Sequence, residues 1–235
     1  MHNTLFKKIS IYRFHIIIAI LVVLLIITLL HFLLSDVNSK SGIIAGGISA
    51  SLIVAIIQFL FSLNEYKSYS DIKKLGIKRI LVSRDDHKFY SNFISKAKKD
   101  IKVMGVTALR MIQDFADESS PREDKKVLLT ALSRSVTVKI LLPELSYLHN
   151  QKDAEKSLQS KPILEKINKK YDNFEVHYFS HVPTHSIFLV DQECILGPVF
   201  SNYESKDTPC IYMSINNDFA SKYLDYFDNE WKESK

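Results

Sequence analysis

The chain has 235 residues, with 31 Lys plus Arg against 26 Asp plus Glu, a formal net charge of +5 and a pI near 9.0. It is 46% hydrophobic, too apolar for a disordered chain, and its six Gly and six Pro exclude collagen-like and low-complexity classes. Its two cysteines, Cys194 and Cys210, cannot form a disulfide framework or a four-thiolate zinc site, and they suit a reducing compartment. A basic balance of this size first suggests nucleic acid or an anionic membrane as partner.

Two apolar stretches, residues 16–34 and 42–63, are each long enough to cross a bilayer as a helix, which needs about 20 residues. A cleavable signal peptide is the alternative for the first stretch. That stretch is longer than the apolar core of a signal peptide, and a poor cleavage site follows it. We therefore expect a two-helix transmembrane region over residues 1–64, a polar and probable-helical connector over 65–76 read simply as a continuing helix, and one soluble domain over 77–235.

The basic residues that flank these stretches predict the topology. Lys7, Lys8 and Arg13 precede the first stretch, Lys40 alone lies between the two, and five Lys or Arg follow the second by position 79. The excess of Lys and Arg marks the cytoplasmic side, so both termini are expected in the cytoplasm and the chain in the inner membrane with two spans. Much of the positive charge is thus a topology signal, and we expect the lipid bilayer as partner and not nucleic acid.

Small residues recur every four positions in the second apolar stretch, at Gly42, Gly46 and Ala50, and again at Gly47 and Ser51. Such spacing lets two helix backbones approach closely in lipid. It predicts either packing against the first helix of the same chain or association of several hairpins into a homo-oligomer.

Beyond the membrane region, short apolar runs alternate with amphipathic stretches, which predicts an α/β fold. The expected strands are residues 78–83, 101–106, 136–142, 174–179, 186–190, 195–199 and 211–215. The expected helices are residues 89–99, 123–133, 154–171 and 219–232.

The runs KRILVSRDD, IKVMGVT, VTVKILLP, THSIFLVD, ILGP and the late FDNEW resemble the phospholipase D-like family over residues 75–235. The resemblance implies a mixed-sheet α/β sandwich. In that family a strand carries H-x-K-x(4)-D, whose His attacks phosphorus and whose Lys binds phosphate oxygens. Two copies of the motif face each other across the site.

The motif is incomplete in this chain. Aligning on Asp191 places Thr184 at the His position and Ser186 at the Lys position, whereas aligning on His185 places Ile187 at the Lys position. Neither register keeps the Lys, whose fixed charge supports the developing negative charge. The resemblance therefore leans against catalysis; His185 and Asp191 are the catalytic candidates if the chain is an enzyme.

Polar residues at the ends of the expected strands are candidates for a phosphate or nucleotide pocket. The candidate ligand-binding residues are Arg84, Thr107, Thr184, His185 and Ser186. Arg84 is read either as a phosphate contact or as a solvated surface arginine.

His177, His181 and His185 match no zinc-ligand spacing, so we expect no metal and no cofactor.

Three functions stay open at this point. The first is a membrane-anchored sensor and effector whose soluble domain binds a ligand, a nucleotide among the candidates, or a partner protein, and drives hairpin oligomerisation and membrane disruption. Its architecture resembles membrane effectors of bacterial antiviral defence. The second is a membrane-anchored phosphodiesterase with His185 as nucleophile in a dimeric site, and the third is a non-catalytic membrane scaffold.

Overall fold

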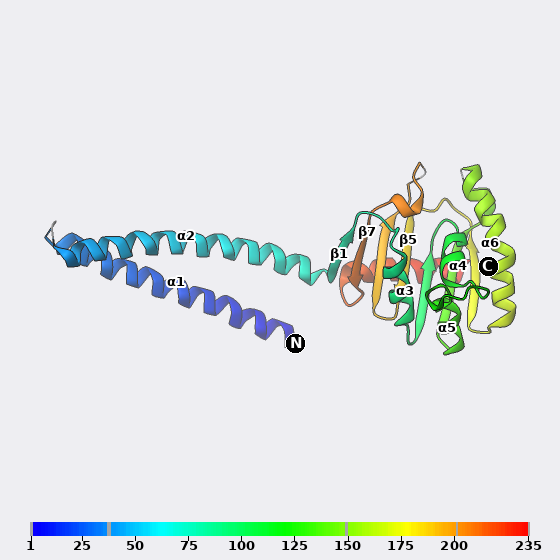
Figure 1. The fold of residues 1–235 in the computed structure, drawn as a ribbon, viewed down its shortest axis with the longest axis horizontal. Helices are drawn as coiled ribbons and strands as arrows, with labels where there is room; N and C mark the ends of the chain where they lie inside the picture. Colours follow the sequence, from blue (N-terminus) through cyan, green and yellow to red (C-terminus); the bar gives the residue numbers. More distant parts are fainter. Residues whose placement is uncertain (1, 37–38, 149, 201, 235) are drawn as a thin grey trace. The chain divides into compact units, whose positions relative to one another are not determined.

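A computed structural model describes residues 2–36, 39–148, 150–200 and 202–234, with side chains outside 2–13, 64, 66–68 and 70–71. The chain forms two compact units, Met1–Asp71 and Ile72–Lys235. Figure 1 follows both along the sequence.

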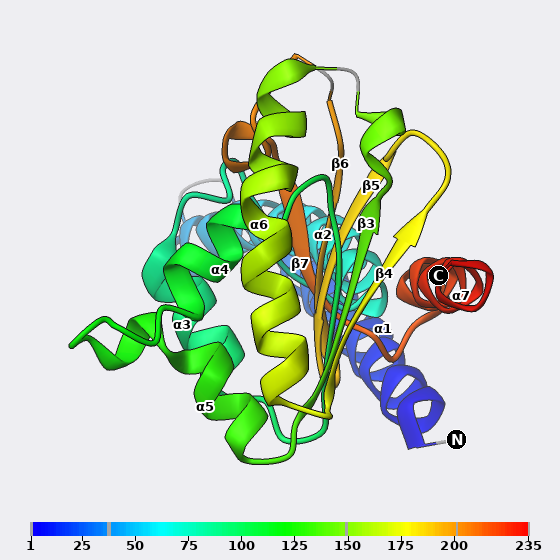
Figure 2. The same ribbon diagram turned by 90° about the vertical axis from the view of Figure 1, so that its right-hand side faces the viewer.

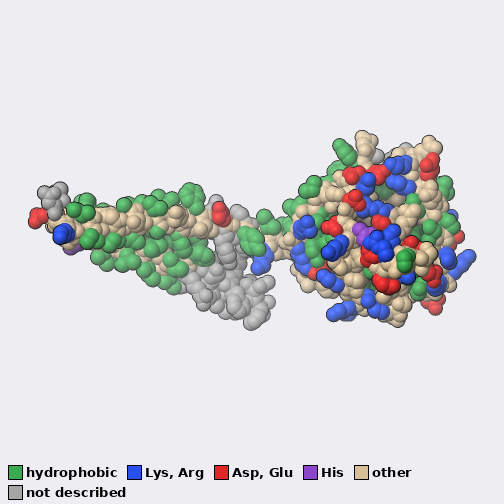
Figure 3. All heavy atoms as spheres, viewed as in Figure 1, with side chains coloured by type: hydrophobic (Ala, Val, Ile, Leu, Met, Phe, Trp, Pro, Cys, Tyr) green, Lys and Arg blue, Asp and Glu red, His purple; other side chains and the backbone are tan. Residues whose placement is uncertain are grey.

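The first unit contains helix α1 (His2–Leu34) and most of helix α2 (Lys40–Lys74). Each helix contains a segment long and apolar enough to cross a membrane, Phe14–Leu34 in α1 and Lys40–Leu63 in α2. On the face shown in Figure 3, hydrophobic side chains cover these helices between their ends, whereas acidic and basic side chains are interspersed over the second unit.

The two helices pack against each other in antiparallel fashion. Ser49 Oγ donates a hydrogen bond to Thr28 Oγ1 at 3.0 Å, and the rings of Phe14 and Phe59 lie 5.4 Å apart. The hydroxyl groups of Ser49 and Thr28 thereby find partners within the apolar segment, where an unpaired polar group is costly.

The small residues of α2 divide between two faces of the helix. Gly42 is buried, and a Cβ added to Gly46 would lie 3.0 Å from two ring carbons of Phe32 in α1. Ala50 and Gly47 are exposed, and a Cβ added to Gly47 would meet nothing within 4 Å. Gly42 and Gly46 therefore serve packing within the chain, while Gly47 and Ala50 leave a second face of small residues uncovered.

The second unit is built on a seven-stranded mixed sheet in the order β1-β7-β6-β5-β2-β3-β4. Strands β2, β3 and β4 pair in parallel and the other neighbours pair antiparallel. The strands are β1 (Ile77–Leu81), β2 (Asp100–Met104), β3 (Thr137–Pro143), β4 (Phe174–Phe179), β5 (His185–Val190), β6 (Glu193–Pro198) and β7 (Cys210–Ser214). The expected mixed α/β fold with two preceding apolar helices is confirmed.

Helices cover both faces of this sheet, as Figure 2 shows with the sheet seen nearly edge-on. One face carries α3 (His87–Ser95), α4 (Leu109–Phe115), α5 (Val127–Ser133) and α6 (Gln151–Lys170), and the other carries α7 (Asp218–Glu233). Asp86 caps α3, because its side chain accepts a hydrogen bond from Phe89 N at 2.9 Å. Asn150 and Asn217 cap α6 and α7 in the same way.

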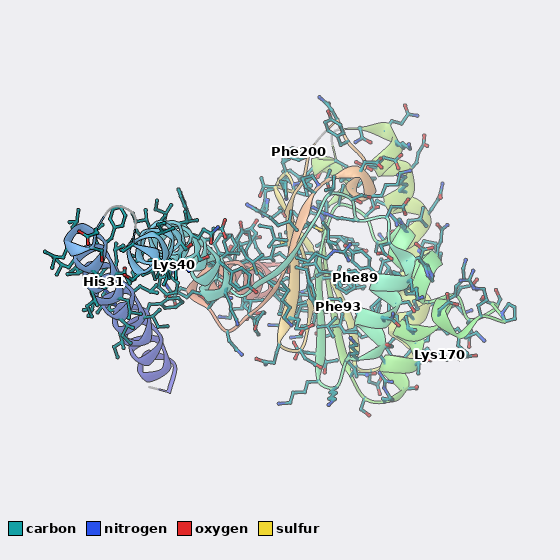
Figure 4. All side chains as sticks on the ribbon, turned by 60° about the vertical axis from the view of Figure 1, so that its left-hand side comes forward. His31, Lys40, Phe89, Phe93, Lys170 and Phe200 are labelled. Carbon is teal, nitrogen blue, oxygen red and sulfur yellow. The ribbon has the colours of Figure 1, made fainter. Side chains whose placement is uncertain are left out.

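Each face of the sheet has its own apolar core. On the α3–α6 side, the Phe93 ring lies 5.6 Å from Tyr212 and 5.9 Å from Phe188, and Figure 4 labels Phe89 and Phe93 at this contact. On the α7 side, fully buried Phe227 packs beside Trp231, with ring centroids 5.9 Å apart. These two cores fix the sheet and hence the loops at its ends.

Helix α2 runs into β1 through a two-residue turn. Gly76 N donates to Lys73 O at 3.0 Å, and the positive φ of Gly76, 69°, ends the helix in the manner of a glycine C-cap. A Cβ on Gly76 would lie 2.7 Å from Asn217 Nδ2 and 3.0 Å from Ser214 O. Glycine is required here both by conformation and by space, so the end of α2 is held against β7 and the start of α7.

Candidate functional site

A cavity of about 610 Å³ opens where strands β2 and β3 end. We call it the carboxyl-end cavity, because Val106 and Thr107 follow β2 and Tyr147 and Leu148 follow β3. Ligands of α/β proteins commonly bind at the carboxyl ends of parallel strands.

The far wall of the cavity is the β6–β7 loop, residues 199–209. Phe200, Tyr203, Glu204, Lys206 and Thr208 of this loop line the cavity. Phe200 and Tyr203 are exposed, and Figure 4 labels Phe200 at the end of the sheet where this loop projects. Within the loop, buried Thr208 donates from Oγ1 to Ser205 O at 2.9 Å, which holds its turn closed.

Charged side chains from three elements meet in this cavity, and most of them are paired. Arg110 of α4 bonds Asp85 Oδ1 at 2.6 Å and Asp114 Oδ2 at 3.4 Å. Asp153 of α6 accepts from Asn150 Nδ2 at 2.6 Å.

Of the five candidate ligand-binding residues, two line the cavity and three do not. Thr107 and Thr184 are on its wall, brought together from the end of β2 and the start of β5. Ser186 and His185 are neighbours in β5, so their side chains point to opposite faces of the sheet. Arg84 is buried behind the wall formed by Pro198.

His185 faces helix α7. Its Nδ1 lies 2.8 Å from Thr184 Oγ1, and its ring packs edge-on against Tyr223 and Tyr226 with centroids 5.5 and 5.8 Å away. Burial raises the pKa of Tyr226, so that phenol stays neutral beside it.

Asp191 lies just past the opposite end of β5 from His185. Its carboxylate accepts hydrogen bonds from the backbone N–H groups of Lys98, Lys99 and Asp100 at 2.8, 2.8 and 3.1 Å. Its φ is +52°, a left-handed conformation that Asp tolerates better than most residues. The structure thus gives Asp191 a local task, tying the β5–β6 turn to the start of β2. The six-residue strand between them separates it from His185 by about 20 Å.

Arg84 follows β1 and is only 8% exposed. Its Nη2 donates to Pro198 O at 3.0 Å and to Pro209 O at 3.3 Å, the two residues that bracket the β6–β7 loop. Its backbone N donates to Lys206 O at 2.7 Å, and Ser83 Oγ donates to the same oxygen at 2.8 Å. The interpretation of Arg84 as a solvated surface residue is wrong, because the loop folds over its side chain.

The other two histidines of the sequence cluster are separately engaged. His177 stacks on Trp231 with centroids 4.0 Å apart, and His181 Nε2 lies 2.9 Å from Glu230 Oε2. Burial opposes a charge on His181, but the carbonyl of Val182 and the carboxylate of Glu230 outweigh it and raise the pKa of His181. Among the described residues, no group of three or more His, Cys, Asp or Glu is placed to hold a metal ion.

Sequence reasoning missed the charged wall of the cavity, formed by Lys156, Glu204 and Lys206. Lys156 belongs to a helix and the other two to a loop about 50 positions later, so no spacing rule joins them. The weak signal available was the polar character of the 201–209 segment.

No protein-family model matches the chain, and no curated protein matches it. Two solved structures share a weak likeness. TrmBL2, an archaeal chromatin protein reported with a novel mode of DNA binding, is 11% identical over 81% of this chain and 70% of its own, with a TM-score of 0.46. Phosphatidylserine synthase from Haemophilus influenzae Rd KW20 is 9% identical over 66% of this chain, with a TM-score of 0.45. This chain spans only 38% of that protein. At these values neither likeness tells what this chain binds or does.

Proposed function

We propose that this protein is a membrane-anchored sensor whose α/β domain binds a small ligand in the carboxyl-end cavity and passes binding on to the membrane helices. The observation that carries the proposal is the pair of bonds from Arg84 to Pro198 and Pro209. They tie the cavity wall to the residue that follows β1, and β1 begins two residues after α2 ends.

This path is short and made of bonded groups. A ligand that displaces the β6–β7 loop must move Lys206 O, which holds both Ser83 Oγ and Arg84 N. Those two residues continue β1, which pairs with β7 on one side only, at the edge of the sheet. An edge strand with one partner shifts more readily than a central one, so β1 is suited to relay movement to α2.

Replacing Arg84 with Met tests this connection. We expect backbone amide exchange to accelerate at least tenfold in both the β6–β7 loop and β1, because two carbonyls and one anchored loop lose their shared donor. Exchange in β2 and β3 should stay unchanged. The measurement is hydrogen–deuterium exchange of the full chain in detergent micelles, read by mass spectrometry.

Arg134 supplies the matched control. It also donates to two backbone carbonyls, Ser95 O at 3.1 Å and Ala97 O at 3.2 Å, but it is exposed and away from the cavity. Arg134→Met should leave the loop and β1 unchanged. Faster exchange in the loop with an unchanged β1 would break the proposed connection and favour the scaffold alternative.

The output that we propose is hairpin association that disrupts the membrane, as expected of an effector in bacterial antiviral defence. The uncovered small residues Gly47 and Ala50 support it, since a second hairpin can approach closely there. Both termini are placed in the cytoplasm in this proposal, as the flanking Lys and Arg predict.

Two neighbouring glycines separate association between chains from packing within the chain. Gly47→Leu should leave the hairpin intact and at least halve the loss of membrane potential on induced expression, because its side chain fills only the uncovered face. Gly46→Leu instead meets Phe32 and should disrupt the hairpin itself. The measurement is a potential-sensitive dye in expressing cells, with Val54→Leu, an exposed position of the same helix, as control. Full depolarisation by the Gly47→Leu protein would rule out association through this face.

A further inference from the structure

Glu204 of the β6–β7 loop is surrounded by three lysines. It is hydrogen-bonded to Lys152, and its carboxylate oxygens lie 3.6 Å from Lys156 Nζ and 3.8 Å from Lys206 Nζ. The hydrogen bond from Lys152 and the nearby Lys156 lower the pKa of Glu204, so it is ionised at neutral pH. Three ammonium groups facing one carboxylate leave this group, the lysine cluster, with an excess of positive charge.

The lysine cluster belongs to the carboxyl-end cavity. Lys156, Glu204 and Lys206 all line it. The cluster also joins two elements, since Lys152 and Lys156 lie one turn apart on α6 and Glu204 lies on the loop that forms the opposite wall. The ion pairs therefore hold the β6–β7 loop against α6.

A second positive charge lies behind the same wall. The Arg84 side chain is bound by the carbonyls of Pro198 and Pro209, and its Nε is buried without a hydrogen-bond partner. Within the described part of the chain, no carboxylate lies within 4 Å of its guanidinium nitrogens. A buried cation without an acidic partner favours an anion in the adjoining space.

We propose that the ligand of this cavity is a small molecule bearing a phosphate or polyphosphate group, and that Glu204 occupies the place of that group until the ligand binds. The inference rests on the proposed function, because it assigns the chemistry of the same cavity. A phosphate group carries more charge and more acceptor oxygens than a carboxylate, so it competes with Glu204 for the lysines. Displacing Glu204 unties the loop from α6, and the loop is the wall that Arg84 joins to β1.

Inorganic triphosphate is the probe for this assignment, measured by isothermal titration calorimetry on the full chain in detergent micelles. Glu204→Gln should bind it at least tenfold more tightly than the wild-type protein, because the internal competitor loses its charge. Adding Lys156→Gln to Glu204→Gln should remove that gain. A gain that survives the loss of Lys156 would overturn the proposed site.

Glu118 supplies the matched control, since it pairs with Lys166 and Lys170 on the same helix α6 but does not line the carboxyl-end cavity. Glu118→Gln should leave triphosphate affinity unchanged. Equal gains from both variants, or no binding to Glu204→Gln, would overturn the inference.

Amide exchange of β1 keeps the two proposals apart. Triphosphate binding that depends on Glu204 and leaves exchange in β1 unchanged would sustain the ligand assignment and count against the sensor. Altered exchange in the Arg84→Met protein, without any triphosphate binding, would do the reverse.

Discussion

Replacing Gly197 with alanine is expected to lower the free energy of unfolding of the α/β domain by about 3 kcal/mol. An added Cβ would lie 2.1 Å from Arg84 Nη2 and 2.7 Å from Pro209 O. The first contact drives the guanidinium from its buried position, and the second presses on the backbone that closes the β6–β7 loop. Both hydrogen bonds that Arg84 makes to Pro198 and Pro209 are then lost.

Urea denaturation of the full chain in detergent micelles measures this effect. Trp231, the single tryptophan, packs between His177 and Phe227 and reports on the unfolding of the domain by its fluorescence. The control is Gly105→Ala at the end of β2, where an added Cβ meets nothing within 4 Å. It should change the free energy of unfolding by less than about 0.5 kcal/mol. Equal stabilities of the two variants would show that Arg84 is not held by the space at Gly197.

The contrast between these two glycines shows what a sequence can reveal about this cavity. The sequence draws attention to Gly105, because a glycine at the end of a strand permits close approach of a ligand. In the structure Gly105 has open space beside it, and the crowded glycine is Gly197. The crowding comes from Arg84, more than 100 positions earlier, and no local pattern records a contact of that separation.

The strands were more accessible to prediction than the helices. All seven expected strands occur, because each is a short β-branched or aromatic run between polar turns, and their ends differ from the structure by one to three residues. Helix α4 (Leu109–Phe115) had no assigned range, since seven residues make barely two turns and show no clear period. The expected helix over 123–133 is a 3₁₀ turn, Glu123–Lys125, followed by α5.

The candidate site could be predicted only in part. Thr107 and Thr184 were accessible because both stand at strand ends, where side chains of an α/β fold converge. Arg84 was interpreted as either exposed or bound to phosphate, since burial of a charged residue after an edge strand depends on the distant loop that covers it. The lysine cluster depends on how the β6–β7 loop meets α6, which only the folded chain specifies.

Asp191→Ala is expected to lower the free energy of unfolding by about 2–3 kcal/mol, because three backbone N–H groups lose a charged acceptor. Alanine also tolerates the positive φ of position 191 poorly, at a cost of about 1 kcal/mol that is included in this range. Asp191→Asn keeps one acceptor oxygen and a side chain suited to that conformation, so it should lose about half as much. Urea denaturation followed by Trp231 fluorescence measures both variants.

Asp172, an exposed carboxylate past the end of α6, supplies the control, and Asp172→Ala should be close to neutral. The same variants examine the phosphodiesterase alternative, because a catalytic Asp191 would lose activity as Asn while keeping its stability. The three N–H bonds to Lys98, Lys99 and Asp100 argue for the opposite order, with stability falling first. An Asp191→Ala protein as stable as the wild type would mean that this carboxylate is not held for structure, and it would return Asp191 to the catalytic candidates beside His185.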